Sequence, residues 1–279
     1  MKSVWLAGAA LLAAAPALAQ GDCFPSETSN EARTMAIFDV PLAFSAAAAP
    51  VREPAGRLRI GLEASYLPDI DDETATPTTC RPGKGPENTD FLFAAPRPRV
   101  VLTLPAGLRL EASWIPPIRL NEAKANLFGL SLGTAFPLGG SGTLGIRGHA
   151  TVGKIEAPIT CDDDALADVT SECYLGTRSN DSFKPNIFGV EAAVGWALGG
   201  SLRPYLGLGY NHLAPRFRVN FTNRNGEVDR RRVTVDLDRA VLFAGATWAF
   251  ASSADLSAEI YSAPTDAVTG RVAGRIRLR

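Results

Sequence analysis

The sequence predicts an all-β protein that closes into an antiparallel transmembrane β-barrel of about 10 strands, with 8–12 possible. Three observations predict this fold class. Apolar and polar residues alternate from Arg57 to the C-terminus, tight turns alternate with long loops, and aromatic residues gather at the ends of the expected strands. Beyond the N-terminus no apolar run approaches the roughly 20 residues that a membrane-spanning helix needs.

The alternation has the two-residue period of a β-strand. In the first segment Leu58, Ile60 and Leu62 share one face, while Arg59 and Glu63 lie on the other. Near residues 213–215 the phase changes, which indicates a bulge. Ten segments of this kind are expected, at residues 57–66, 97–104, 108–114, 125–137, 144–152, 188–196, 202–220, 229–250, 254–262 and 268–278.

The connections distinguish a barrel from a soluble β-sandwich, whose strands also alternate. Residues 105–107, 138–142, 199–201 and 251–253 form tight turns, and the intervening links include two long polar loops at residues 69–96 and 158–184. Short turns at one end and long loops at the other are typical of membrane barrels.

Aromatic residues are sorted to both strand ends, as expected for two girdles at the membrane interfaces. Tyr66, Trp114, Tyr210 and Tyr261 fall at the long-loop ends, and Phe136, Trp196 and Phe250 fall beside the tight turns.

The N-terminus carries an export signal. Lys2 precedes an apolar stretch, and Ala17 and Ala19 supply the small residues of a cleavage site, so residues 1–19 are expected to be a signal peptide. Residues 20–56 are expected to form an N-terminal extension or plug, and residues 57–279 the barrel.

Four cysteines in an exported chain are expected to pair, although one or both pairs could stay reduced. Cys161 and Cys173 lie close in sequence within one loop and are paired first, which leaves Cys23 for Cys80. If that second pair forms, residues 20–56 must thread the lumen to reach the loop, which is the plug hypothesis.

With its signal peptide, ten alternating segments and sorted aromatics, the chain resembles the bacterial outer-membrane β-barrel superfamily over roughly 220 of its 279 residues. The resemblance is to an architecture, without a subfamily motif. It implies a monomer in the bacterial outer membrane that contacts membrane lipid and lipopolysaccharide and is inserted by the outer-membrane assembly machinery. Such barrels usually end on an aromatic residue, whereas this chain ends on Arg279.

The face opposite the apolar one is expected to line the lumen, where eleven arginines meet seven acids. These charges either pair across strands as a polar core or line a narrow, weakly anion-preferring pore. The lumen-facing set is expected to be Arg57, Arg59, Glu63, Arg97, Arg99, Arg109, Glu111, Arg147, Glu191, Arg203, Arg232, Asp236, Asp238, Asp255, Glu259, Arg271, Arg275 and Arg277.

Other function classes find little support. The 28 basic and 29 acidic residues argue against nucleic acid as a partner, and no spacing indicates a metal site or a cofactor. His149 is expected in the mid-lumen and His212 near the rim, and no enzymatic motif accompanies either, so no catalytic residue and no enzyme are expected. The sequence favours a structural or surface-interaction role. The alternatives are passive passage of small solutes and hydrophobic-solute transport with an N-terminal plug.

Overall fold

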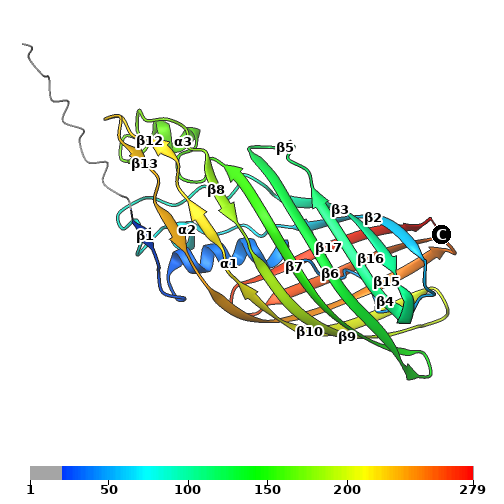
Figure 1. Ribbon diagram of the computed structural model, residues 1–279. Helices are drawn as coiled ribbons and strands as arrows, with labels where there is room; N and C mark the ends of the chain where they lie inside the picture. Colours follow the sequence, from blue (N-terminus) through cyan, green and yellow to red (C-terminus); the bar gives the residue numbers. More distant parts are fainter. Residues whose placement is uncertain (1–20, 279) are drawn as a thin grey trace, which may run out of the picture.

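The structure, a computed structural model, describes residues 21–278. Within them, ten antiparallel strands form a closed barrel, because the last strand pairs with the first (Figure 1). The predicted fold class is therefore confirmed, with ten strands. The predicted signal peptide lies outside the described residues. The barrel strands are β2 (Leu58–Tyr66), β3 (Ala94–Thr103), β4 (Leu108–Ile115), β6 (Ala123–Gly139), β7 (Gly142–Ala157), β9 (Ile187–Trp196), β10 (Leu202–Leu213), β15 (Leu237–Ala251), β16 (Ala254–Ala263) and β17 (Ala267–Arg277).

The outer surface of the barrel is apolar. Leu62, Leu130, Leu208 and Ile260 are between 55% and 63% exposed, whereas the next residue of β2, Glu63, points inward and is fully buried. A water-soluble protein rarely exposes so many aliphatic side chains on one continuous surface. An apolar exterior around a polar interior is the arrangement of a transmembrane barrel.

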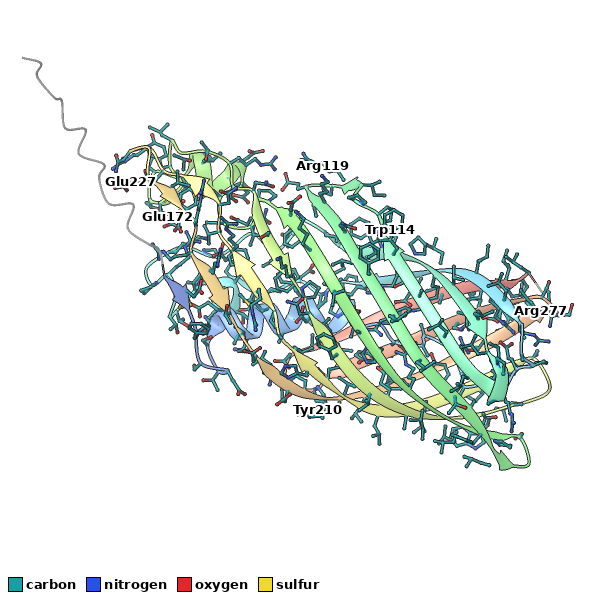
Figure 2. All side chains as sticks on the ribbon, viewed as in Figure 1. Trp114, Arg119, Glu172, Tyr210, Glu227 and Arg277 are labelled. Carbon is teal, nitrogen blue, oxygen red and sulfur yellow. A yellow bond between two sulfur atoms is a disulfide. The ribbon has the colours of Figure 1, made fainter. Side chains whose placement is uncertain are left out.

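Six of the seven predicted girdle residues lie on this outer surface, including Trp114 and Tyr210, which are 48% and 49% exposed (Figure 2). Tyr261 is the exception, because it is fully buried inside the barrel. Along β16 it shares the face of Asp255 and Glu259, both of which point inward, so its assignment to the girdle is wrong. The other exposed members are Tyr66, Phe136, Trp196 and Phe250.

The two ends of the barrel differ in their connections. At one end, the short-turn end, adjacent strands are joined by the 3-10 turn η1 (Pro105–Gly107) and by residues 140–141, 197–201 and 252–253. At the other, the long-loop end, the connections include residues 67–93, 158–186 and 214–236.

Three wall strands continue past the barrel at the long-loop end. They form a smaller sheet of β8 (Asp181–Lys184), β11 (Arg216–Arg218) and β14 (Arg232–Thr234), and β1 (Asp22–Cys23) joins its edge in parallel. The prediction of one continuous strand over 202–220 is wrong, because Pro215 separates β10 from β11 and supplies no N–H for the ladder. The expected strand over 229–250 is likewise split, and β8 lies in what was expected to be a loop.

We call this sheet, the long loops and their short elements the cap. Both predicted disulfides are present in it: Cys23–Cys80 and Cys161–Cys173. The short elements are α2 (Asp72–Ala75), α3 (Asp163–Ala167), β5 (Arg119–Leu120), β12 (Phe221–Thr222) and β13 (Val228–Asp229).

The N-terminal segment enters the barrel from the cap. Helix α1 (Asn30–Leu42) begins at Ser29, whose hydroxyl accepts a hydrogen bond from the Ala32 N–H at 3.1 Å. Phe38 packs on Phe91 and on Phe183 of β8, with ring centroids 5.2 and 6.0 Å apart. None of the helices in residues 21–278 is long and apolar enough to cross a membrane. After α1 the chain runs through the interior to β2, which starts at the short-turn end (Figure 1).

Candidate functional site: the filled lumen

Most of the expected lumen charges lie inside the barrel, and they pair. Arg99, fully buried, contacts Glu63 and Glu111, and Arg97 lies 3.6 Å from Glu63. The remaining inward pairs are Arg59–Asp255, Arg109–Glu111, Arg147–Glu191, Arg271–Glu259 and Arg275–Asp255.

Three expected lumen residues instead lie on the outside. Arg232, Asp236 and Asp238 have side chains 60%, 56% and 59% exposed. The odd-numbered residues point inward on both sides of the break between β14 and β15, and at the cap this inner face is apolar, so Leu237 points inward and Asp238 outward. Arg239 is the inward charge of this stretch, and it pairs with Asp266 at 2.6 Å.

Three further members, Arg57, Arg203 and Arg277, lie at the short-turn end. Together with Arg59 they line an open, polar groove at the mouth of the barrel. They mark the end of the lumen and contribute nothing to its centre.

The centre of the lumen is occupied by the chain itself. We call residues 40–49 the lumen segment, and its backbone carbonyls accept hydrogen bonds from wall arginines. Arg271 donates to the Val40 carbonyl at 2.8 Å and Arg97 to the Leu42 carbonyl at 2.7 Å. Further donors are Thr151 to Leu42, Arg147 to Phe44, and Arg99 to both Ser45 and Ala46.

Two more contacts tie the lumen segment to β16 and β15. The Ser45 hydroxyl donates to Glu259 at 2.6 Å, and the Ala49 N–H donates to the Thr247 hydroxyl at 2.9 Å. Since unpaired buried carbonyls are costly, these bonds allow the end of α1 and the irregular chain after it to remain in the barrel without a strand partner.

Phe44 is the centre of this arrangement. Its fully buried ring faces the guanidinium groups of Arg99, Arg97 and Arg147 at 4.6, 5.4 and 5.9 Å from the ring centroid. A cation within about 6 Å of an aromatic centroid is attracted to the ring face. A Cβ atom on Gly129 would lie 3.0 Å from the ring, so this glycine leaves room for it.

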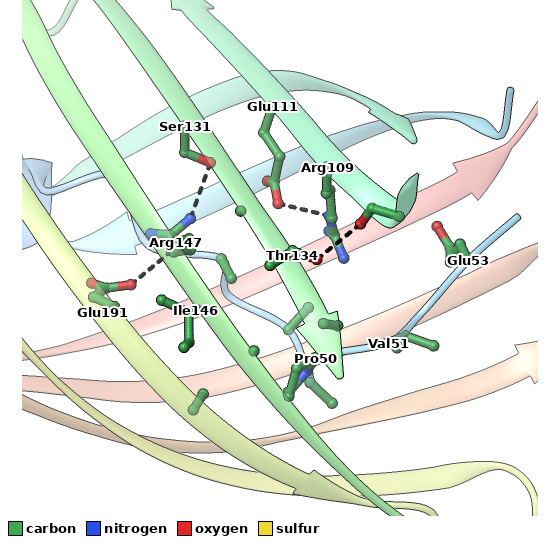
Figure 3. Close-up of a pocket in the computed structure, with 18 of the residues that line it drawn as sticks. Pro50, Val51, Glu53, Arg109, Glu111, Ser131, Thr134, Ile146, Arg147 and Glu191 are labelled. Atoms are coloured by element: carbon green, nitrogen blue, oxygen red, sulfur yellow. Dashed lines mark hydrogen bonds and ion pairs between the residues drawn. The ribbon is translucent and has the colours of Figure 1, made fainter. Parts of the chain in front are cut away.

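Two cavities flank the lumen segment. On the short-turn side, a cavity of about 60 Å³ lies between residues 46–53 and the wall strands β4, β6 and β7 (Figure 3). Figure 3 shows Arg147 bonded to Glu191 and Ser131 above it and Arg109 paired with Glu111 beside it. On the cap side, α1 and the cap sheet border a cavity of about 50 Å³ whose lining is almost wholly apolar.

The histidines lie at the predicted depths. His149 is buried in the lumen, with Nε2 3.4 Å from a Glu191 oxygen. His212 is exposed near the rim, and its Nδ1 lies 2.9 Å from Asp238. No nucleophilic serine or cysteine contacts either histidine in the described hydrogen bonds, and no metal-binding group of three or more His, Cys, Asp or Glu occurs in residues 21–278.

Sequence reasoning missed several interior groups. The Tyr261 hydroxyl donates to Glu191 at 3.0 Å and accepts from Asn211 at 2.9 Å, and the Tyr205 hydroxyl donates to Glu259 at 3.0 Å. The two-residue period indicates that Tyr261 points inward, because it lies two positions from Glu259. Nothing in the local pattern around Ser45 indicates that it contacts the barrel wall.

These features define a class, a ten-stranded transmembrane β-barrel with a filled lumen. The predicted resemblance to bacterial outer-membrane barrels is confirmed at the level of architecture. No family model matches the sequence, and no curated protein matches it.

Solved outer-membrane barrels are similar in fold at very low identity. Ail, the attachment invasion locus protein of Yersinia pestis, is 12% identical over 80% of this chain and 99% of its own, with a TM-score of 0.33. KdgM porin is 6% identical over 79% and 99%, with a TM-score of 0.31. Neisserial surface protein A is 11% identical over 79% and 95%, with a TM-score of 0.27.

Proposed function

We propose that the protein is a sealed, monomeric outer-membrane barrel, inserted by the outer-membrane assembly machinery, that acts through the surface of its cap. In this orientation the long-loop end faces the outside of the cell and the short-turn end faces the periplasm. The observation that carries the proposal is the lumen segment, whose carbonyls are bonded by buried arginines of the wall.

The sealing is energetic as well as steric. Ion passage would require the segment to leave, which would break several hydrogen bonds to charged donors, each contributing about 1.5–3 kcal/mol. It would also separate Phe44 from three guanidinium groups. A ten-stranded barrel has no spare width beside such a segment, since an eight-stranded one is already filled by side chains.

The cap is a suitable interaction surface because it is rigid and exposes apolar groups. Two disulfides staple it, and three wall strands extend into it. Val169 and Leu175 are 70% and 68% exposed, and Val228 of β13 is 42% exposed. Large exposed aliphatic side chains on a stapled platform favour contact with another surface.

Planar-bilayer recording of the purified protein tests the seal. We expect no conductance steps from wild-type protein whose insertion is verified by heat-modifiable gel migration. A porin of known conductance serves as the positive control. Regular steps from the wild type would contradict the proposal and favour a pore.

Adhesion measurements test the surface role. Vesicles that carry the protein are applied to arrays of immobilised polysaccharides and proteins. Binding should fall in the cap variant Val169→Ser/Leu175→Ser and persist in the control Ile260→Val, which alters only the lipid-facing wall. Absence of binding by the wild type across such arrays would favour a purely structural role.

A second candidate is passage of small apolar solutes, because two cavities with largely apolar linings flank the lumen segment. Met35 and Phe38 line the cap-side space and would contact such a solute. Saturable binding of an apolar fluorescent probe such as N-phenylnaphthylamine, weakened by the cavity-filling variant Ala75→Leu and accompanied by probe flux into liposomes, would favour transport. Binding without flux would leave the barrel sealed.

A further inference from the structure

The outer face of the cap sheet is basic. Five cations project from four adjacent strands, and we call them the basic face: Lys154 of β7, Lys184 of β8, Arg216 and Arg218 of β11, and Arg232 of β14. The ladder register places Arg216 opposite Lys184, and Arg218 opposite Arg232. Continuing the β7–β8 register by one residue brings Lys154 beside Lys184.

The strand period fixes the direction of these side chains. Their neighbours along the strands, Phe183, Phe217 and Val233, point inward and are 4%, 8% and 2% exposed. The cations therefore point away from the protein: Lys184 and Arg218 are exposed, and the side chain of Arg232 is 60% exposed.

Carboxylates balance only part of the positive charge of the basic face. Lys154 pairs with Glu156 at 2.6 Å, Arg216 with Asp236 at 3.0 Å, and Arg232 lies 4.0 Å from Asp22. Within residues 21–278, no carboxylate forms an ion pair with Lys184 or Arg218, and these two lie at the centre of the face.

Like charges directly opposite each other on one sheet face destabilise the sheet. The basic face contains two such pairs, Lys184–Arg216 and Arg218–Arg232. An anion bound between the two cations of a pair would attract both of them and offset their repulsion. The arrangement therefore fits a surface that is occupied by anionic groups.

The position of the basic face points to the anion. Phe188, the first lipid-facing side chain of β9, is 49% exposed and lies four residues below Lys184. At about 3.3 Å per residue and a strand tilt of about 40°, Lys184 lies roughly 10 Å above it in height. The polar layer of a bilayer begins at the edge of the hydrocarbon and is roughly 5–8 Å thick on each side. The basic face thus borders the headgroup layer on the side wall of the protein.

We propose that the basic face binds the phosphate groups of a phosphorylated glycolipid in the outer leaflet. Guanidinium forks match phosphate oxygens in a bidentate manner, and a lysine ammonium adds a point charge. The Lys184–Arg216 pair would hold one phosphate and the Arg218–Arg232 pair a second. The proposal rests on the outer-membrane location and cell-surface orientation given above, and it is independent of whether the lumen conducts.

Native mass spectrometry in zwitterionic detergent tests the proposal with diphosphorylated lipid A as the probe. Each Lys or Arg near an anionic membrane surface contributes about 1 kcal/mol, so Lys184→Gln/Arg218→Gln should weaken lipid A binding roughly 30-fold. Arg224→Gln removes an exposed cation from the cap hairpin and should leave binding unchanged. Lys184→Arg/Arg218→Lys should restore it, and heat-modifiable migration verifies that each variant is folded.

Two comparisons separate the phosphate from other sources of affinity. Lipid A with both phosphates removed should bind wild type and double variant alike, and added salt should weaken only the phosphorylated lipid. Equal binding of diphosphorylated lipid A by wild type and double variant would overturn the proposal. It would also be overturned if a soluble sulfated oligosaccharide, and not the lipid, lost affinity in the double variant, because the face would then serve a soluble polyanion. Conductance of the wild type would refute the sealed barrel and leave this result unaffected.

Discussion

Replacing Phe44 with alanine is expected to release the lumen segment from the barrel wall while leaving the barrel closed. The ring is fully buried and lies against three guanidinium groups, so no other single side chain of the segment makes as many wall contacts of this kind. The wall strands keep their own ladders, which do not involve Phe44.

The magnitude follows from burial. Phe→Ala at a buried position costs about 3–5 kcal/mol, which includes the cavity left behind. The cation–π contact with Arg99, the nearest guanidinium, accounts for roughly 0.5–2 kcal/mol of the interaction. Taking about 4 kcal/mol for the whole change, local opening of the segment should become roughly a thousandfold more frequent, since 1.4 kcal/mol corresponds to a factor of ten.

Hydrogen–deuterium exchange of peptides that cover residues 40–49 measures this opening. The reporting amides are those of Ala43, Ala47 and Ala49, which donate to Asp39, Ser45 and Thr247. Phe24→Ala is the matched control, because Phe24 is 71% exposed and its removal should leave exchange unchanged.

Exchange in Phe44→Ala that rises by less than about tenfold would refute the reasoning, since the segment would then be held by something other than its wall contacts. Unchanged protection of peptides from β16 and β17 is required as well, because a global loss of structure would also expose the lumen segment.

Three further predictions concern the cap and the wall. Cys23→Ser/Cys80→Ser should lower the free energy of unfolding by about 4 kcal/mol and Cys161→Ser/Cys173→Ser by about 3, because the closed loops span 57 and 12 residues; equal losses in urea titrations would contradict the loop-length argument. Gly153→Ala should destabilise by roughly 1–3 kcal/mol, because φ is +132° and a Cβ would lie 2.1 Å from the Asn126 carbonyl, while Gly274→Ala, with open space, should be neutral in the same titration. Burial alone would raise the pKa of Glu31, but the N–H groups of Cys80 and Thr79, each 2.7 Å away, lower it below its usual value. The contribution of the Glu31 carboxylate to stability is therefore complete above about pH 4.5 and is lost as the pH falls through the lowered pKa. Phosphine reduction of Cys23–Cys80 should accelerate in that acidic range for wild type, and Glu31→Gln should be fast throughout; a pH-independent wild-type rate would refute this.

Alternation predicted the barrel because each wall strand faces lipid on one side and a polar interior on the other. The pattern failed where this two-sided environment ends. Beyond the barrel, the cap sheet faces water on one side and the apolar core around Phe38 on the other, so Phe183 and Phe217 point inward. The phase of the alternation stays the same across that boundary, but the polar face becomes the outer one, so taking polar residues as inward assigns Asp238 to the wrong face.

The cysteines were the basis for predicting the lumen segment. Residues 40–49 are mostly apolar and lack a strand period, because their partners are side chains of the wall rather than a neighbouring strand. The pairing of Cys23 with Cys80 carries the topological information, since it anchors the N-terminus at the end of the barrel opposite the start of β2. Which carbonyl meets which arginine depends on the three-dimensional register.

The excess of arginine over acid among the predicted lumen charges has a physical explanation in this segment. Pairing with carboxylates uses only some of the N–H groups of the inward arginines, because a guanidinium has five of them in a fixed fork. Arg99 uses its groups on Glu63 and on the Ser45 and Ala46 carbonyls together, which a lysine ammonium cannot match in geometry. The irregular part of the lumen segment has no β-ladder, so its carbonyls require donors from the wall. A surplus of inward arginines in a narrow barrel is therefore itself a signal that part of the chain fills the lumen.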